Sequence, residues 1–356
     1  MKVAVVGAGN GGTAVATDLA YRGHEVTLIK TSKSIHDDNF DYLLDNEGRM
    51  TLDEFGEYKT ANIAHVTRDL SAVKGCPVVI IYVQTNYHEA VIERLSEHLE
   101  DGQILLINPG YLSTAYVLKH CKKDIIVAEA TSSFIDCRIK ELGMIKVGFR
   151  NVRNPIGIYP RSRREEAIKI LDQLGFPLFY VNSVVETALH NPNLIVHTVG
   201  AVMSIPRVEK TNGDYVMYHE VFTPSVWKIL EKLDSEKMDV LEHLGFERMP
   251  YVEACKFRNS LDDDRDAKEV FFWYAAMPTR AKGPTSVESR YITEDVPQGL
   301  VMLEALGKSL NIPTPIATSL IELAGAALGR DMRAEGRTPE MLGEDNILSI
   351  LDDCRK

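Results

Sequence analysis

The sequence contains few cysteines and no long apolar segment. Its five Cys residues lie far apart and form no C-x-x-C pair, so neither a disulfide framework nor a zinc site is indicated. The longest apolar run, near residues 78–83, has the length of a strand and falls short of the roughly 18 residues that a membrane span requires. We expect reduced, mostly buried thiols, no bound metal and no membrane partner.

Positive charge is also scarce. The chain has 40 Lys and Arg against 51 Asp and Glu, a formal charge of -11. No block of basic residues offers the surface that nucleic acid or an anionic membrane needs. The apolar run at the N-terminus leads into glycines and not into a cleavage site of small residues, unlike a signal peptide. We therefore expect a cytoplasmic protein that binds small molecules and no nucleic acid.

The first half of the chain alternates short β-rich runs with helical patterns. With 356 residues, of which 45% are hydrophobic, the chain is long enough for two globular domains. The β-rich runs lie at 2–6, 25–29, 78–83, 104–107 and 125–128. The helical patterns between them lie at 12–21 and 89–99. This alternation predicts βαβ units and a doubly wound, mostly parallel sheet of the Rossmann type.

The pattern changes in the second half of the chain. Strand-like pieces continue at 146–150, 157–159 and 177–181, with a helix at 164–174. After residue 182, helices are predicted at 192–203, 224–244, 297–310 and 315–328. Each begins with Pro, which suits a first helical turn. The sequence thus predicts an α/β protein with a dinucleotide-binding domain over 1–182 and a mostly α-helical substrate and catalytic domain over 183–356. The acidic segment 34–60 is expected to form an excursion beside the second strand.

A glycine motif joins the first predicted strand to the first predicted helix. Gly7, Gly9 and Gly12 form G-x-G-x-x-G, with Asn10 and Gly11 between the last two. In this context the first glycine permits the tight turn, the second lets the backbone approach a pyrophosphate, and the third allows close packing of helix and strand. These five residues are therefore candidates for dinucleotide binding. A glycine turn without a ligand is the alternative.

The end of the second predicted strand bears on the choice of dinucleotide. An acid there would accept the ribose 2′-OH of NAD, but the chain has Lys30, Thr31, Ser32 and Lys33 instead. Basic and hydroxyl side chains suit the charge of a 2′-phosphate, which favours NADP(H) over NAD(H). Alternatively, these are solvated residues of a turn.

Three more candidates follow two later strands of the predicted sheet. Gln84 comes after the strand at 78–83, and Asn108 and Gly110 come after the strand at 104–107. Ligands of open α/β sheets bind beyond the carboxyl ends of the strands, so we expect these residues on the nicotinamide side of the site. The same side chains are also common in loops without a ligand.

Histidine is the natural candidate for proton transfer in the second half. Asn193 and His197 are four residues apart at the start of a predicted helix, so they share one face of it. His190 begins the same segment; it ranks second to His197 as the catalytic histidine and is a candidate for substrate binding. For a histidine in such an apolar run, a hydrogen-bonded core position is the alternative.

A second constellation precedes the predicted helix at 297–310. Asp295 would orient an imidazole and favour its charged form, and Arg290 would hold a carboxylate through two parallel hydrogen bonds. Capping of the following helix explains the acidic residues equally well.

These motifs together resemble a known family. GAGNGG at 7–12, EATSS at 129–133 followed by Cys137 and Arg138, HNPNLIVHTVG at 190–200 and SRYITEDVPQGL at 289–300 are similar to the NAD/NADP octopine/nopaline dehydrogenases, the opine dehydrogenases. The resemblance spans nearly the whole chain. It implies a Rossmann domain and a helical domain with the active site in the cleft between them, often as a homodimer.

The resemblance also implies an activity and residue roles. Members of this family join an amino acid to a 2-oxo acid such as pyruvate, and NAD(P)H reduces the resulting imine. The catalytic histidine then corresponds to His197, its accompanying Asn to Asn193, its orienting aspartate to Asp295, and the carboxylate-binding arginine to Arg290.

Two other functions remain open at this point. A simple 2-oxo or 2-hydroxy acid oxidoreductase of the ketopantoate reductase kind would use the same fold and a similar His–Asp pair. A dinucleotide-binding sensor without catalysis would need only the glycine motif.

Overall fold

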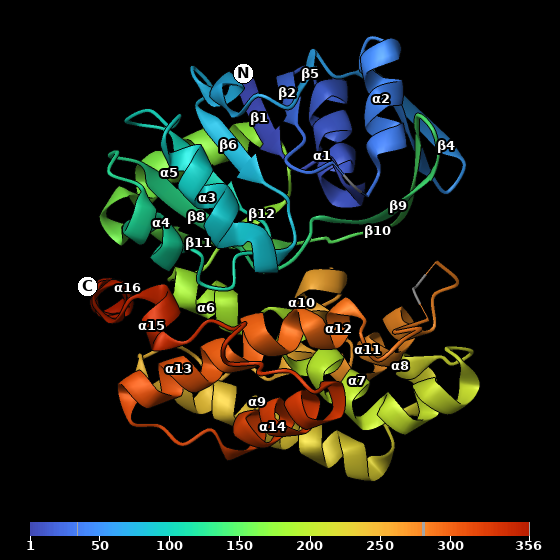
Figure 1. Cartoon of the computed structure of the whole chain (residues 1–356), viewed down its shortest axis with the longest axis vertical. Coiled ribbons are helices and arrows are strands. Elements are labelled where there is room, and N and C mark those ends of the chain that lie inside the picture. Colours follow the sequence, from blue (N-terminus) through green and yellow to red (C-terminus); the bar gives the residue numbers. More distant parts are fainter. Residues whose placement is uncertain (34, 280–281, 356) are drawn as a thin grey trace. The chain divides into compact units, whose positions relative to one another are not determined.

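The structure is a computed structural model that describes residues 1–33, 35–279 and 282–355. It divides into two compact units, Met1–Val184 and Val185–Lys356. The sequence places the boundary after residue 182, two residues earlier. Both units are drawn in Figure 1, with the elements labelled along the chain. Among the described residues, no helix combines the length and apolar character needed to cross a membrane.

The first unit is built on a large twisted sheet. In the described part it has eight strands in the order β12-β11-β8-β7-β6-β1-β2-β5. The strands are β1 Lys2–Val6, β2 Glu25–Ile29, β5 His65–Thr67, β6 Val78–Ile81, β7 Ile104–Ile107, β8 Ile126–Ala130, β11 Asn154–Tyr159 and β12 Leu178–Tyr180. All neighbours run parallel except β8 and β11. Strands β6 and β7 are wholly buried, as their continuous apolar sequences require in a sheet covered on both faces.

Chain order reverses beside β1. The chain passes from β1 to its neighbour β2, whereas β6 and β7 follow on the other side of β1. Such a switch point is where open α/β sheets bind ligands, beyond the carboxyl ends of the strands. The glycine loop follows β1, and the segments with Gln84 and Asn108 follow β6 and β7. The sheet therefore brings these three loops to one edge.

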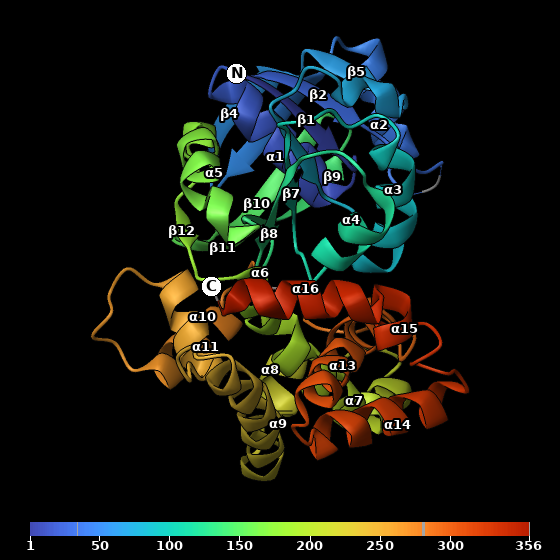
Figure 2. The same ribbon diagram turned by 90° about the vertical axis from the view of Figure 1, so that its left-hand side faces the viewer.

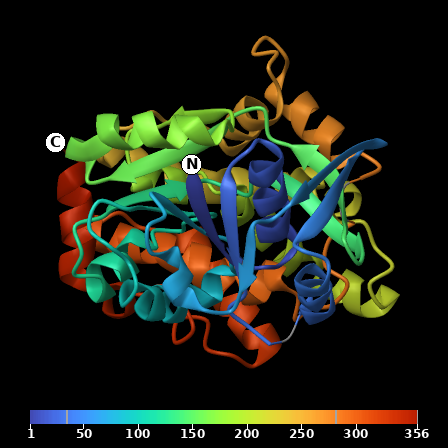
Figure 3. The same cartoon turned by 90° about the horizontal axis from the view of Figure 1, so that it is seen from above.

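Helices cover both faces of this sheet. They are α1 Asn10–Tyr21, α2 Asp37–Asp45, α3 His88–Ser96, α4 Thr114–His120 and α5 Arg164–Leu171. Figures 2 and 3 show α3 and α4 on one face and α5 on the other. The sequence predicts α1, α3 and α5 but neither α2 nor α4. It makes β6 two residues too long, because the chain turns after Ile81 into a short 3-10 helix, Thr85–Tyr87.

A second sheet was not predicted as such. In the described part it has four strands in the order β4-β3-β10-β9. They are β3 Arg49–Glu54, β4 Glu57–Asn62, β9 Ile135–Glu141 and β10 Met144–Arg150. The acidic excursion at 34–60 therefore contains α2 and a hairpin, whose strand β3 pairs with the distant β10. In Figure 1 β9 and β10 run together as long strands towards β4.

Helix α1 lies between the two sheets. It packs against β2 of the large sheet and against β4 and β9 of the small one. Its buried stretch, Gly12–Leu19, is made mostly of Gly, Ala, Thr and Val. Such small side chains let both sheets approach the helix backbone closely. The small sheet thus fixes the helix that follows the glycine loop.

The second unit is helical throughout its regular elements, which confirms the predicted fold class. The helices are α6 Val184–Leu189, α7 Pro192–Thr211, α8 Met217–Glu220, α9 Pro224–His243, α10 Tyr251–Asn259, α11 Ala267–Ala275, α12 Arg290–Thr293, α13 Val301–Leu310, α14 Pro315–Leu328, α15 Pro339–Leu342 and α16 Glu344–Cys354. A π-helix, η5 Val296–Leu300, leads into α13. Helix α7 is longer than predicted, because it continues through Pro206. It contacts α9, α12, α14 and η5, so it forms the centre of this unit.

Candidate active site

His197 lies inside the second unit on the central helix α7. The helix begins at Pro192, and the side chain of Asn191 accepts a hydrogen bond from the Asn193 backbone N–H at 3.0 Å. This cap satisfies one of the amide groups that every helix start leaves without a partner. It fixes the first turn, and His197 follows one turn after Asn193. The His197 residue is only 5% exposed.

The two ring nitrogens of His197 both have partners. Its Nδ1 lies 2.8 Å from Oδ2 of Asp295, a buried residue at the start of η5. Because an ionised carboxylate only accepts hydrogen bonds, Nδ1 carries the proton in this pair. The other nitrogen, Nε2, lies 3.2 Å from the hydroxyl oxygen of Tyr218 on α8. The histidine is therefore oriented at both ends.

A tyrosine covers one face of the same imidazole. The ring of Tyr291 stacks on that of His197, with centroids 3.8 Å apart and planes 6° from parallel. Tyr291 belongs to α12, the short helix before Asp295. Sequence reasoning selected His197 and Asp295, which the structure brings into contact, but it missed Tyr218 and Tyr291. For Tyr291 the available signal is its place within SRYITEDVPQGL. Tyr218 lies outside every motif.

The predicted catalytic residue Asn193 and the predicted substrate-binding residue Arg290 lie near this group along the chain. Asn193 is half-buried on α7 and lies one helical turn before His197. Arg290 begins α12, next to Tyr291, and its side chain is 53% exposed. One of its terminal nitrogens lies 3.9 Å from Glu294 Oε2. Arg290 therefore presents a cation on the helix that holds the stacking tyrosine.

The structure places His190 in a different set of neighbours. It lies between α6 and α7, and its Nδ1 is buried without a hydrogen-bond partner in the described part of the chain. Burial lowers the pKa of His190 well below its usual value, and the positive charge of Lys237 lowers it further. Lys237 is itself buried, and its ammonium lies 2.6 Å from Asp234 Oδ1. His190 therefore belongs to this buried charged cluster, whereas His197 belongs to the group with Asp295.

In the first unit, glycine is needed at different positions of the loop after β1 for different physical reasons. Gly7 has a φ of 118°, a conformation that other residues rarely adopt. A Cβ on Gly12 would lie 1.8 Å from the Gly7 carbonyl oxygen, and one on Gly11 would lie 2.7 Å from the Tyr82 ring. A Cβ on Gly9 would meet no atom within 4 Å. The fold therefore requires the other three, while Gly9 leaves open space beside the backbone.

The open space at Gly9 lies at the start of α1. Gly9 is the N-cap of this helix, and no side chain caps it. The first turn of a helix leaves N–H groups that favour an anion. The residues present therefore fit a dinucleotide pyrophosphate. Asn10, another candidate of this loop, has its side-chain oxygen bonded to the Ile139 backbone N–H of β9 at 2.7 Å, so it ties the loop to the small sheet.

One interpretation of the sequence makes Lys30 a solvated residue of a turn, and the structure contradicts it. Lys30 is 3% exposed, and its ammonium donates to the Ile35 carbonyl at 2.7 Å and lies 3.5 Å from Asp37. Burial lowers the pKa of Lys30, although the charge of Asp37 opposes this effect. Its neighbours in the loop differ, since Thr31 is half-buried and Ser32 is exposed. The buried ammonium of Lys30 thus stabilises the loop after β2 through its contacts with Ile35 and Asp37.

Arg68 adds a cation that the sequence did not single out. It follows β5, and its guanidinium donates to the Ser32 carbonyl and, at 2.8 Å, to Asp37 Oδ1. The hydrogen bond from Arg68 lowers the pKa of Asp37. The guanidinium also lies 4.5 Å from the centre of the Phe40 ring. Arg68 was missed because it is distant in sequence, and because the short strand before it was not predicted.

Gln84, Asn108 and Gly110 lie beyond β6 and β7, as the sequence places them. Gln84 is exposed at the start of the 3-10 helix Thr85–Tyr87. Asn108 is fully buried, and neither polar atom of its carboxamide has a hydrogen-bond partner in the described part of the chain. A Cβ on Gly110 would lie 1.9 Å from Glu129 Oε2, so only glycine fits there.

Glu129 is a buried carboxylate that holds the loop after β7. It accepts hydrogen bonds from the backbone N–H groups of Leu112 at 2.8 Å and Thr114 at 2.6 Å. The hydroxyl of Thr114 also donates to it, at 2.7 Å. Three donors compensate for removing this charge from water. The loop with Asn108 and Gly110 therefore has a fixed shape.

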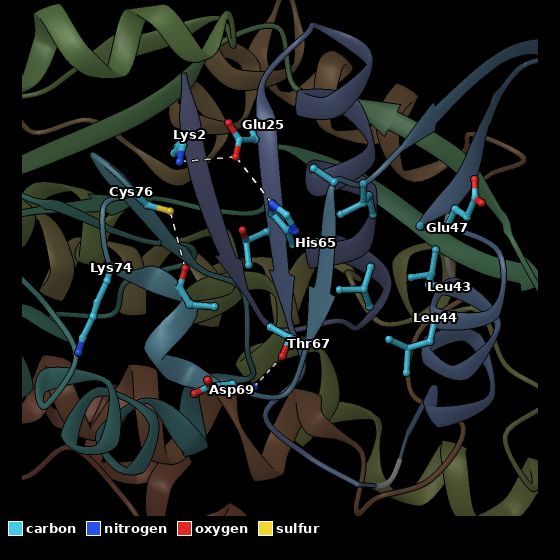
Figure 4. A pocket seen from close by; sticks show the side chains of 16 residues that line it. Lys2, Glu25, Leu43, Leu44, Glu47, His65, Thr67, Asp69, Lys74 and Cys76 are labelled. Carbon is cyan, nitrogen blue, oxygen red and sulfur yellow. Dashed lines mark hydrogen bonds and ion pairs between the residues drawn. The ribbon is translucent and has the colours of Figure 1, made fainter.

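A cavity of about 670 Å³ lies elsewhere on the first unit, along the edge strand β5. Figure 4 shows Lys2, Glu25 and His65 near one another on its wall, with Leu43 and Leu44 of α2 on another side. None of the predicted site residues lines it. This cavity is therefore separate from the loops at the carboxyl ends of β1, β6 and β7.

Known proteins are similar to this chain over nearly its whole length. Residues 180–328 match the model for NAD/NADP octopine/nopaline dehydrogenase, alpha-helical domain, and residues 2–114 match the model for NAD-dependent glycerol-3-phosphate dehydrogenase N-terminus. The opine dehydrogenase of Arthrobacter sp. (strain 1C) is 27% identical over 352 residues, which is 96% of this chain and 94% of that protein. The chain is thus similar to the octopine/nopaline dehydrogenases, through the helical-domain model and through a relative that covers nearly its whole length.

Solved structures share the fold of this chain. An octopine dehydrogenase in complex with NADH and agmatine has a TM-score of 0.75, at 18% identity, over 99% of this chain and 98% of that one. A yersinopine dehydrogenase with NADP+ bound has a TM-score of 0.74, at 14% identity, over 100% and 99%. The stretch matched by the helical-domain model contains every predicted catalytic and substrate residue: His190, Asn193, His197, Arg290 and Asp295.

Proposed function

We propose that this protein is an NAD(P)H-dependent opine dehydrogenase, which condenses the amino group of an amino acid with a 2-oxo acid such as pyruvate and reduces the product. The observation that supports this most directly is the 2.8 Å contact between His197 and Asp295, inside the stretch matched by the octopine/nopaline dehydrogenase model. A buried, oriented imidazole is suited to proton transfer near neutral pH.

The cofactor would be held by the first unit. The start of α1 at Gly9 would bind its pyrophosphate, and the loops with Gln84, Asn108 and Gly110 would lie on the nicotinamide side. When bound, the reduced nicotinamide supplies the hydride for reduction of an imine. The buried carboxamide of Asn108 has no hydrogen-bond partner among the described residues and offers both a donor and an acceptor.

The substrates would be handled by the second unit. His197 exchanges a proton with the reacting nitrogen or oxygen, and Asp295 stabilises the imidazolium that forms. The guanidinium of Arg290 binds the carboxylate of the 2-oxo acid through paired hydrogen bonds. Asn193, one turn from His197, holds the ring or a substrate oxygen, whereas the buried position of His190 beside Lys237 does not favour the substrate-binding role that the sequence predicts for it.

NADP(H) is the proposed cofactor in preference to NAD(H). The loop after β2 contains Lys30, Thr31, Ser32 and Lys33, and Arg68 lies against the same loop. A guanidinium has five N–H donors, and the bonds of Arg68 to Ser32 and Asp37 use two of them. Because Lys30 is already engaged inside the loop, Arg68 is the stronger candidate for contact with a 2′-phosphate.

We also propose that the protein works in the cytoplasm. The five cysteines are free thiols, four of them buried, which fits a reducing cytoplasm. We propose that the protein forms a homodimer, as the family resemblance implies. Light scattering on the purified protein would measure its mass against the 39.8 kDa of one chain.

The deciding experiment follows the absorbance of NADPH, and then NADH, with pyruvate or glyoxylate, with and without a mixture of amino acids. Oxidation that requires the amine is the expected result. Oxidation by an oxo acid alone would instead identify a simple 2-oxo acid reductase. Cofactor binding without turnover across the panel would favour a dinucleotide sensor.

A further inference from the structure

The hydroxyl group of Tyr218 faces Nε2 of His197, the ring nitrogen that does not contact Asp295. Since Asp295 accepts from Nδ1, only Nε2 of the imidazole is left to exchange a proton with a substrate. The hydroxyl of Tyr218 lies within hydrogen-bond distance of Nε2, at 3.2 Å. Tyr291 occupies one face of the ring and offers no hydrogen bond to Nε2 in that stacked position. The phenol of Tyr218 is therefore placed to exchange a proton with Nε2.

Tyr218 is held firmly in this position. It is 3% exposed and lies on the short helix α8 beside the fully buried Met217. The backbone N–H of Met217 donates to the Lys282 carbonyl at 2.8 Å. A Cβ on Gly200 of α7 would lie 2.8 Å from the sulfur of Met217, so α8 rests directly on the helix of His197.

Aromatic contacts fix the ring of Tyr218 on its other side. Its centroid lies 6.4 Å from that of Phe222, which in turn packs edge-on against Trp227 and Phe271 at 6.2 and 5.7 Å. Moving the phenol away from His197 would disturb this cluster, and repacking a buried aromatic side chain costs free energy. Passing a proton through the hydroxyl requires no such movement.

We propose that Tyr218 is a catalytic residue that relays the proton between His197 and the substrate. The phenolic O–H gives its proton to the substrate nitrogen or oxygen, and the Nε2–H of the His197 imidazolium restores it to the phenolic oxygen. One proton is thereby transferred from the imidazolium to the substrate, and Asp295 stays ionised throughout. This assignment rests on the proposed reductive condensation, since it uses the same site.

Tyr218→Phe tests the relay, because it removes the hydroxyl and keeps the ring. We expect kcat to fall by roughly 10²- to 10⁴-fold, with little change in KM for the 2-oxo acid, since general acid–base groups contribute about that much. If Tyr218 were only displaced by the substrate, the variant would keep or increase kcat, and that result would overturn the proposal.

A matched variant separates a relay from a general effect of losing a tyrosine hydroxyl. Tyr215 is buried, and its hydroxyl contacts that of Ser204, away from His197. Tyr215→Phe should retain kcat within a few-fold. A loss in this variant as large as that in Tyr218→Phe would contradict the specific role of Tyr218.

Two further measurements keep the test independent of turnover by the phenylalanine variant. A fluorinated tyrosine at position 218 makes the phenol more acidic, so the pH profile of kcat should shift towards lower pH. In ¹⁵N-labelled protein, the Nε2 signal of His197, assigned with His197→Gln, should move in Tyr218→Phe. An unchanged Nε2 signal would refute the hydrogen bond itself. If the wild type shows no amine-dependent oxidation, the proposed function fails, and the Nε2 signal still decides the contact.

Discussion

The loop after β1 and the group around His197 are built by opposite means. The loop is made of backbone: Gly9 leaves space beside a helix start, and no side chain caps that helix. The His197 group is made of side chains from α7, α8, α12 and the residue before η5, each fixed by another. Substitutions in the loop should therefore act through shape, and substitutions around His197 through protonation.

The two regions also differ in what holds them in place. Helix α1 is fixed by two sheets, and Asn10 bonds to β9 of the smaller one. His197 is fixed by contacts within a helical unit, with Asp295, Tyr218 and Tyr291 as direct neighbours. Cofactor affinity and catalytic proton transfer should thus respond to separate sets of substitutions, and this separation can be measured.

The largest expected effect is on catalysis alone. His197→Ala should lower kcat by roughly 10²- to 10⁴-fold, because it removes the group that moves the proton. The Kd for NADPH, measured by fluorescence titration, should change less than about threefold, since the cofactor residues lie in the first unit. Turnover near that of the wild type would exclude His197 as the catalytic base. A parallel loss of NADPH affinity would contradict the separation of the two regions.

Two glycines of one loop provide the sharpest test of shape. Gly9→Ala should preserve the melting temperature, because its Cβ meets no atom within 4 Å, yet weaken NADPH binding about tenfold or more by filling the space for the pyrophosphate. Gly12→Ala should lower stability by about 1–3 kcal/mol, because its Cβ would overlap the Gly7 carbonyl oxygen. Thermal denaturation and a binding titration distinguish the two. Equal NADPH affinity in Gly9→Ala and the wild type would show that the cofactor does not approach Gly9.

The elements that the sequence predicts well have local signals. Strands β1, β2 and β7 and helix α14 appear with the predicted bounds, because apolar runs and Pro at a helix start are read within a few residues. The small sheet was missed because β3 and β10 are each half-exposed and pair across almost a hundred residues. Pairing over such a distance depends on tertiary packing and leaves no local pattern.

The same distinction applies to the site. His197 and Asp295 stand in motifs with a family resemblance, and the structure brings them to 2.8 Å. Tyr218 and Arg68 reach their places only through the fold, Tyr218 from a four-residue helix and Arg68 from beyond a three-residue strand. The charge of Lys30 was visible in the sequence, but its burial was not. Residue type can be read from the sequence, whereas accessibility follows from packing.

A smaller effect should separate the two nicotinamide cofactors. Arg68→Ala should raise the KM for NADPH by roughly 10- to 100-fold and leave that for NADH nearly unchanged, since hydrogen bonds between charged groups contribute about 1.5–3 kcal/mol. Arg49→Ala, at an exposed arginine of β3, removes the same charge as a control. Lys33→Ala tests the other exposed cation of the loop. If Lys33→Ala alone raised the KM for NADPH, Arg68 would not be the phosphate contact.

The smallest effect is a pH dependence of stability in the second unit. Burial holds the pKa of His190 well below its ordinary value of 6.5. The unfolded chain therefore takes up a proton on His190 as the pH falls below about 6.5, while the folded protein does not. The stability from this group is complete above that pH and declines below it. One proton changes the free energy of unfolding by at most about 1.4 kcal/mol per pH unit.

Denaturation of the wild type and His190→Gln at pH 7.5 and 5.5 measures this contribution. The wild type should lose more stability between the two pH values than the variant does. His243→Gln, at an exposed histidine near the end of α9, should behave like the wild type. Because Lys237 stands beside His190 and carries its own charge, Lys237→Met should reduce the pH dependence by removing one cause of the lowered pKa. An equal loss in the wild type and His190→Gln would show that His190 takes up a proton in the folded protein as readily as in the unfolded chain.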